Sequence, residues 1–187
     1  MKIANQITSG RFLLSVAAIV ILAMHPEGPP GAWEYTWIAF WLIVVASSTD
    51  ALDGYVARAM GQTSSFGRLF DPFVDKILVC GSLICLLRLE SMRELLPAWI
   101  VVVIVARELF VTSLRGMVEA QGKSFGADRL GKWKMVAQCL LVGHLVAYQG
   151  GWLWTLHFCQ FFLWLSLGLT VLSALNYQRK AWHVLDY

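Results

Sequence analysis

Long apolar segments separated by short polar ones run along almost the whole chain. An α-helix needs roughly 20 mostly apolar residues to cross the hydrocarbon core of a bilayer, which is about 30 Å thick. Six segments approach this length. We therefore predict an all-α, polytopic membrane protein in which a bundle of six transmembrane helices forms a single domain over residues 1–187. The predicted crossings are residues 7–24, 32–48, 72–89, 95–114, 133–148 and 152–175.

The composition agrees with a chain that has the bilayer as its solvent. Of 187 residues, 58% are hydrophobic and only 14% are charged. The mean hydropathy of +0.62 lies outside the usual range of soluble domains. Six crossings use nearly all of this length, so we expect no separate soluble domain. The first segment follows basic residues as a signal peptide does, but it lacks a small-residue cleavage site, and we expect it to be retained.

The basic residues predict the orientation, because positively charged segments stay on the cytoplasmic side. With the N-terminus inside, only Arg88 and Arg93 among the 15 lysines and arginines lie outside. Each of the two has an acidic neighbour, Glu90 or Glu94. An even number of crossings then places both termini in the cytoplasm.

Four aspartates mark the cytoplasmic ends of the second and third segments, where ionisable side chains are costly and usually functional. Asp50 and Asp53 are three residues apart, and Asp71 and Asp75 are four apart, so each pair shares a face if the backbone is helical. Four clustered carboxylates repel one another unless protons or cations neutralise them, and hard oxygen ligands favour Mg²⁺, Mn²⁺ or Ca²⁺. The alternative is that they are solvated helix ends, with Asp71 capping a helix that begins at Pro72.

The residues around these aspartates extend the pattern. The run DALDGYVAR from Asp50 to Arg58, followed by Gly67, Asp71 and Asp75, matches D-x2-D-G-x2-A-R-x8-G-x3-D-x3-D. The chain thereby resembles the CDP-alcohol phosphotransferase (CDP-alcohol phosphatidyltransferase) family over essentially its whole length. This resemblance implies two divalent cations, Mg²⁺ or Mn²⁺, and a general base at Asp75 that also contacts a metal. The implied metal ligands are Asp50, Asp53, Asp71 and Asp75.

The resemblance also implies a nucleotide site, a homodimer, and an active site that faces the cytoplasm at the inner membrane of a bacterium. Asn5 and Thr8 resemble an N-x-x-T element of the family, although Ala4 stands where the family often has proline. The implied nucleotide-binding residues are Asn5, Thr8, Gly54, Ala57, Arg58 and Gly67.

A second group of basic residues indicates which alcohol accepts the group transferred from the CDP-linked lipid. Arg107 and Arg115 lie on one helical face, and two guanidinium groups suit a phosphate. Together with Lys132 and Lys134 they resemble the phosphatidylglycerophosphate synthase branch, which uses CDP-diacylglycerol and sn-glycerol 3-phosphate. Met135 departs from that branch, which usually has threonine there. The alternative is that these cations snorkel to the membrane interface.

Other interpretations remain open. The transfer of a phosphatidyl group from CDP-diacylglycerol could instead use inositol phosphate, serine or another alcohol as acceptor. A small cation transporter is a different class, but its acids would be spread through the membrane depth. We expect membrane lipids and no nucleic acid as partners. His144 and His157, and the four cysteines, are interpreted as packing residues.

Overall fold

The computed structural model is all-α throughout the part of the chain that it describes. It describes the backbone of residues 3–24, 31, 34–60, 65–122 and 129–185, and the side chains of residues 8–24, 31, 34–49, 70, 72–122 and 129–182. The helices of this part are α1 (Ile3–Met24), α2 (Tyr35–Met60), α3 (Ser65–Leu86), α4 (Ala98–Ala120), α5 (Arg129–Gln149) and α6 (Leu156–Leu185). Short 3₁₀ turns at Glu90–Met92 and Leu153–Thr155 precede α4 and α6. The predicted all-α class and the six helices are confirmed for the described residues.

Several helices extend beyond the apolar segments that predicted them. α2 continues to Met60 and includes Asp50 and Asp53, while α3 begins at Ser65, so that Pro72 lies inside it. The interpretation of Asp71 as the cap of a helix beginning at Pro72 is therefore wrong. Hydropathy marks only the apolar part of a helix, whereas backbone hydrogen bonds continue through polar residues as well.

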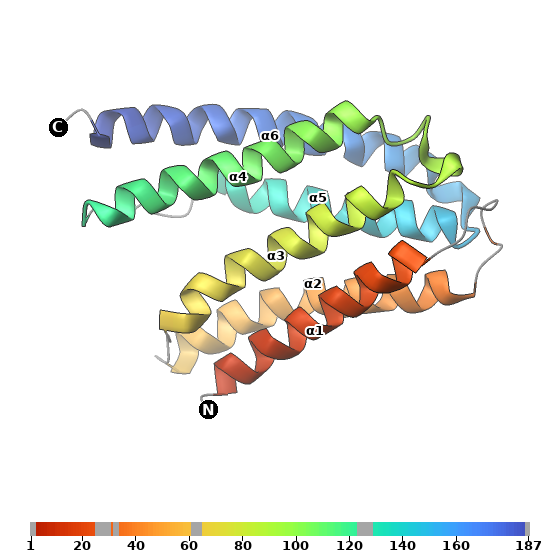
Figure 1. Ribbon diagram of the computed structural model, residues 1–187, viewed down its shortest axis with the longest axis horizontal. Coiled ribbons are helices and arrows are strands. Elements are labelled where there is room, and N and C mark those ends of the chain that lie inside the picture. The colour runs from red at the N-terminus through yellow and green to blue at the C-terminus, as the bar shows by residue number, and fades with distance from the viewer. Residues whose placement is uncertain (1–2, 25–30, 32–33, 61–64, 123–128, 186–187) are drawn as a thin grey trace.

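The helices run up and down the bundle, and both chain ends lie at the same end of it (Figure 1). α1 packs extensively on α2 and α3, and α5 packs on α6, which also contacts α4. The helices α1, α2 and α3 thus form one group, and α4, α5 and α6 form another. The two groups meet where α5 contacts α2 and α3, and where α3 contacts α4. α4 and α5 make little direct contact, which leaves room between them beside α3 and α6.

Apolar side chains fill the interior and also cover the outside. Leu83, Ile104 and Leu141 are fully buried, whereas Trp41 and Leu109 are at least 60% exposed. A helix that is apolar all round belongs in a hydrophobic environment. Within the described residues, the helical stretch Leu153–Trp182 is the one both long and apolar enough to span a membrane unaided. α4 falls short because charged residues interrupt its sequence.

Two glycines join the loops at the end of the bundle away from the chain termini. The amide of Gly31 donates a hydrogen bond to the carbonyl oxygen of Gln149 at 2.8 Å. Gly151 has a φ of +99°, and a Cβ added there would lie 3.2 Å from the Cα of Gly31. Both the backbone conformation and the close approach require glycine at Gly151.

We predict that Gly151→Ala lowers the thermal midpoint of unfolding in detergent, since it combines backbone strain of about 1–3 kcal/mol with a steric contact. Gly168→Ala is the matched control, because a Cβ at that position in α6 meets nothing within 4 Å. We expect it to leave the midpoint unchanged or raise it. Equal midpoints for the two variants would contradict the prediction.

Candidate active site

A cavity of about 440 Å³ lies between α3, α4, α5 and α6. Its volume is within the usual range for small-molecule sites. Helical spacing accounts for its walls, because Pro72, Asp75, Lys76, Val79 and Cys80 lie on one face of α3. Basic side chains outnumber acidic ones around it, so the cavity suits an anionic ligand. Its basic residues are Lys76, Arg107, Arg115, Lys132 and Lys134, and its acidic residues are Asp75, Glu108 and Glu119.

Asp75 forms an ion pair with a buried arginine of the first helix. The Nη2 atom of Arg11 donates to Oδ1 of Asp75, and the two side chains are 2% and 21% exposed respectively. A buried guanidinium is stable in a membrane protein only when a counter-charge or polar groups accompany it. The pair ties α1 to α3, and it orients the carboxylate that we predicted to be the general base.

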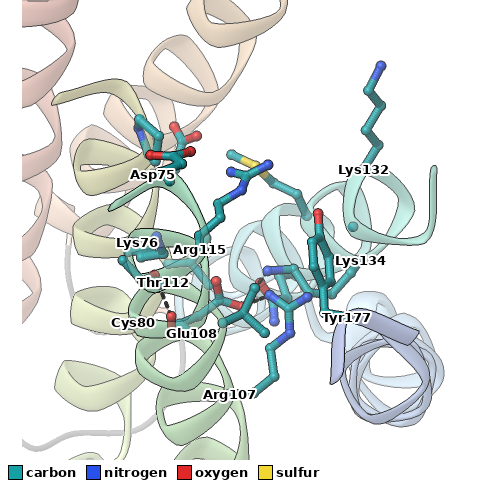
Figure 2. Close-up of a pocket in the computed structure, with 18 residues that line it drawn as sticks. Asp75, Lys76, Cys80, Arg107, Glu108, Thr112, Arg115, Lys132, Lys134 and Tyr177 are labelled. Atoms are coloured by element: carbon teal, nitrogen blue, oxygen red, sulfur yellow. Dashed lines mark hydrogen bonds and ion pairs between the residues drawn. The ribbon is translucent and has the colours of Figure 1, made fainter. Parts of the chain in front are cut away.

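Glu108 holds two cations on the opposite side of the cavity. Its Oε1 atom accepts from Lys134 Nζ on α5 and, at 3.2 Å, from Arg107 Nη1 on its own helix. All three side chains are at least nine-tenths buried. They converge in Figure 2, below and to the right of Asp75. Two of the predicted phosphate-binding cations therefore already have a carboxylate partner.

Arg107 also contacts α6. Its Nη2 atom donates to Ser173 Oγ at 2.9 Å, and its guanidinium carbon lies 5.6 Å from the centre of the Tyr177 ring. Its Nε atom has no hydrogen-bond partner among the described residues. Buried donors are nearly always satisfied by protein, water or a ligand, so an unsatisfied one beside a cavity is a candidate contact for a ligand.

The other two predicted phosphate-binding residues differ from each other. Arg115 is partly buried and lines the cavity, and within the described structure its Nε atom also lacks a partner. Lys132 is exposed, and in Figure 2 it projects away from the cluster around Glu108. The structure thus brings Arg107, Arg115 and Lys134 to the cavity interior, and it places Lys132 at the rim.

The predicted metal and nucleotide residues are only partly described. Thr8 is buried on α1, one turn before Arg11. The backbones of Asp50 and Asp53 lie in α2, and those of Asp71 and Asp75 lie in α3, so the helical condition for each pair to share a face is met. Among the predicted metal and nucleotide residues, the side chains that the structure does not describe are those of Asn5, Asp50, Asp53, Gly54, Ala57, Arg58, Gly67 and Asp71. The convergence of the four carboxylates therefore stays a prediction.

Sequence reasoning missed Arg11, Glu108, Ser173 and Tyr177 as site residues. Arg11 follows Thr8 by three residues, which places both on one helical face within an apolar segment. A charged residue at such a position could have been predicted to belong to the site from the sequence. By contrast, the prediction that His144 is a packing residue is confirmed, because its Nδ1 atom lies 2.7 Å from the Leu140 carbonyl oxygen and its ring stacks on Phe158.

We predict that Arg11→Met lowers the stability of the folded protein by about 3 kcal/mol, because it removes the buried cation that pairs with the Asp75 carboxylate in the described structure. The measurement is thermal or denaturant unfolding in detergent. Arg93→Met is the control, since Arg93 is an exposed residue in the segment that connects α3 to α4. An Arg11→Met protein as stable as the control would show that the ion pair contributes little.

The chain is similar to known proteins over nearly its whole length. The family model of CDP-alcohol phosphatidyltransferase matches residues 1–172. A CDP-diacylglycerol–glycerol-3-phosphate 3-phosphatidyltransferase from Bacillus subtilis (strain 168) is 38% identical over 194 residues, covering 98% of this chain and 97% of the relative. One of the same name from Pseudomonas fluorescens is 34% identical over 186 residues, covering 97% and 91%.

A more distant relative carries another name. A cardiolipin synthase (CMP-forming) from Oryza sativa subsp. japonica is 29% identical over 201 residues, which cover 99% of this chain and 59% of the relative. The family model and the relatives from Bacillus subtilis and Pseudomonas fluorescens span nearly the whole chain, and the resemblance inferred from the aspartate motif is confirmed. The chain belongs to the CDP-alcohol phosphatidyltransferase family.

Proposed function

We propose that this protein transfers a phosphatidyl group from CDP-diacylglycerol to sn-glycerol 3-phosphate, forming phosphatidylglycerophosphate and CMP in phospholipid biosynthesis. The observation that carries the proposal is one cavity that is lined both by the predicted base, Asp75, and by a cluster of cations on α4 and α5. The names of the relatives from Bacillus subtilis and Pseudomonas fluorescens describe the same transfer.

Asp75 is suited to remove a proton from the acceptor. It lines the cavity and is partly exposed, while Arg11 holds one of its oxygens. In the proposed step, a hydroxyl oxygen of glycerol 3-phosphate attacks the phosphorus on the lipid side of the diphosphate, and its proton passes to the Asp75 carboxylate. The bond from that phosphorus to the bridging oxygen breaks, and CMP leaves with that oxygen.

The cations across the cavity are suited to the acceptor's phosphate. Arg107 and Arg115 each have an Nε atom without a partner in the described structure, so both have hydrogen-bonding capacity for phosphate oxygens. Lys134 contributes positive charge close by, although Glu108 shares it. Holding the phosphate here would orient the acceptor with its hydroxyl end toward Asp75.

The family generally uses divalent cations, and we propose Mg²⁺ or Mn²⁺ for this chain. The donor set fits such ions, because four carboxylates on helical pairs provide hard oxygen ligands. Asp50, Asp53, Asp71 and Asp75 would hold them. When bound, the cations supply positive charge that neutralises the diphosphate. The predicted nucleotide-binding residues surround the same aspartates in the sequence.

We propose that all six helices cross the inner membrane of a bacterium, with both termini and the cavity on the cytoplasmic side. The charge distribution supports this orientation. The shared position of both chain ends in Figure 1 agrees with an even number of crossings. A homodimer is proposed from the family resemblance alone.

The cavity itself disfavours a cation transporter. Its basic residues, including the buried Arg107 and Lys134, would repel a passing cation. Other acceptors with a phosphate, such as inositol phosphate, fit the cation cluster as well as glycerol 3-phosphate does. Serine gives these cations no phosphate to bind.

We predict that the purified protein releases CMP from CDP-diacylglycerol when Mg²⁺ and glycerol 3-phosphate are present, and that a chelator stops the release. The acceptor panel should include inositol phosphate, serine and phosphatidylglycerol. Turnover with one of these but not with glycerol 3-phosphate would overturn the acceptor assignment. Ion flux in proteoliposomes without CMP release would favour the transporter.

We predict that Asp75→Asn lowers kcat by roughly 10²- to 10⁴-fold, the usual contribution of a general base. The amide keeps an oxygen that can accept the hydrogen bond from Arg11, so we expect the variant to fold. Single-turnover CMP release measures the loss, and circular dichroism checks the fold. A fully active variant would exclude Asp75 as the base.

A further inference from the structure

One face of α6 carries a row of buried polar side chains that the proposed function does not use. The row consists of Ser166, Thr170, Ser173 and Tyr177, each no more than 5% exposed. Their spacing of four, three and four residues places them on one side of the helix. This side faces the bundle, whereas Trp164, Leu172 and Leu175 on the other sides are exposed.

Ser173 differs from its neighbours in this row because it contacts a cation of the cavity. Its hydroxyl donates to the Thr170 carbonyl oxygen at 3.1 Å and accepts from Arg107 Nη2 at 2.9 Å. A hydroxyl has one hydrogen, and here the backbone takes it. The oxygen is therefore left as an acceptor toward Arg107.

Together these contacts determine the orientation of the Arg107 guanidinium. Glu108 accepts from Nη1, Ser173 accepts from Nη2, and the Tyr177 ring lies near the guanidinium carbon. The Nε atom remains without a partner in the part of the chain that the structure describes, although the residue is only 8% exposed. The contacts with Glu108 and Ser173 thus leave other N–H donors of this buried arginine, Nε–H among them, for a ligand in the cavity.

We propose that Ser173 is a positioning residue that raises the affinity of the site for a phosphate-bearing acceptor by holding Arg107 in its binding orientation. The proposal rests on the proposed function, because it assigns the acceptor phosphate to this cavity. Ser173 acts through Arg107 and does not touch the substrate. An arginine side chain has many rotamers, and a guanidinium that is already fixed loses less conformational entropy when it binds a ligand.

The hydroxyl of Ser173 is not needed to hold α6 in place. α6 packs extensively on α5 and also contacts α4, and its buried apolar residues Cys159 and Leu163 belong to the hydrophobic core. Removing one hydroxyl leaves these contacts intact. A role in binding therefore predicts a changed KM for glycerol 3-phosphate in a folded protein, whereas a role in packing predicts a loss of folding.

The test compares Ser173→Ala with Ser166→Ala. Both serines are fully buried on the same face of α6, but Ser166 Oγ has no hydrogen-bond partner among the described residues. We expect Ser173→Ala to raise KM for glycerol 3-phosphate about tenfold, the usual effect of losing a hydrogen bond to a charged group. KM for CDP-diacylglycerol should stay at the wild-type value, while the thermal midpoint falls only slightly, because Nη2 of Arg107 loses one acceptor. Ser166→Ala should change none of the three.

Two further variants test whether the hydrogen-bond acceptor is responsible. Ser173→Thr keeps the hydroxyl and should restore a low KM for glycerol 3-phosphate, while Ser173→Cys keeps the size and should not, because sulfur is a weak acceptor. The proposal is overturned if Ser173→Ala has the same KM as Ser166→Ala. It is equally overturned if both substrates' KM values rise together, or if Ser173→Ala does not fold.

A binding measurement separates this proposal from the proposed function. The shift of the thermal midpoint by glycerol 3-phosphate needs no CDP-diacylglycerol and no turnover. If wild-type protein shows this shift but releases no CMP, the proposed function fails, and the loss of the shift in Ser173→Ala still supports the positioning role. If wild-type protein shows no shift at all, the positioning role fails even where CMP release continues.

Discussion

The structure depends on the pairing of the charges that its helices bury, as the described side chains show. A charged side chain within a bilayer is costly, and it is accommodated only where an opposite charge or polar groups meet it. Arg11 on α1 meets Asp75 on α3, and Glu108 on α4 meets Lys134 on α5. Each pair connects two helices, so these buried charges also link specific helices to one another.

The second of these pairs spans a gap. α4 and α5 make little direct backbone contact, and the cavity lies between them. Glu108 joins them across this gap through Lys134, and Arg107 joins α4 to α6 through Ser173. A cavity held open by polar contacts can stay hydrated and accept a charged substrate, whereas an apolar gap would close by packing.

This arrangement separates the two substrates by their chemistry. The acceptor is small and anionic, and it is suited to the cation cluster of α4 and α5. The donor is a lipid, and the aspartates proposed to hold its diphosphate lie in α2 and α3, with Asp75 facing the cavity. Arg11 supports Asp75 from α1, so residues from both groups of helices converge on the place where the two substrates would react.

The sequence alone determined the all-α class, the six helices and the family. The length of the apolar segments predicted the helices, because roughly 20 apolar residues match the thickness of a bilayer, and the aspartate motif, which is local in the sequence, resembled that of the family. It also predicted Arg107, Arg115 and Lys134 as phosphate-binding residues, and all three line one cavity. The helix ends were less predictable, because hydropathy does not follow backbone hydrogen bonds through polar residues such as Asp50.

Only the tertiary structure decided which charges meet. Arg11 and Asp75 are 64 residues apart, and Arg107 and Ser173 are 66 apart. No local spacing relates such residues, since their contact depends on how whole helices pack. The sequence therefore determined which residues were available for chemistry, and the packing of α1 on α3 and of α6 on α4 decided their partners.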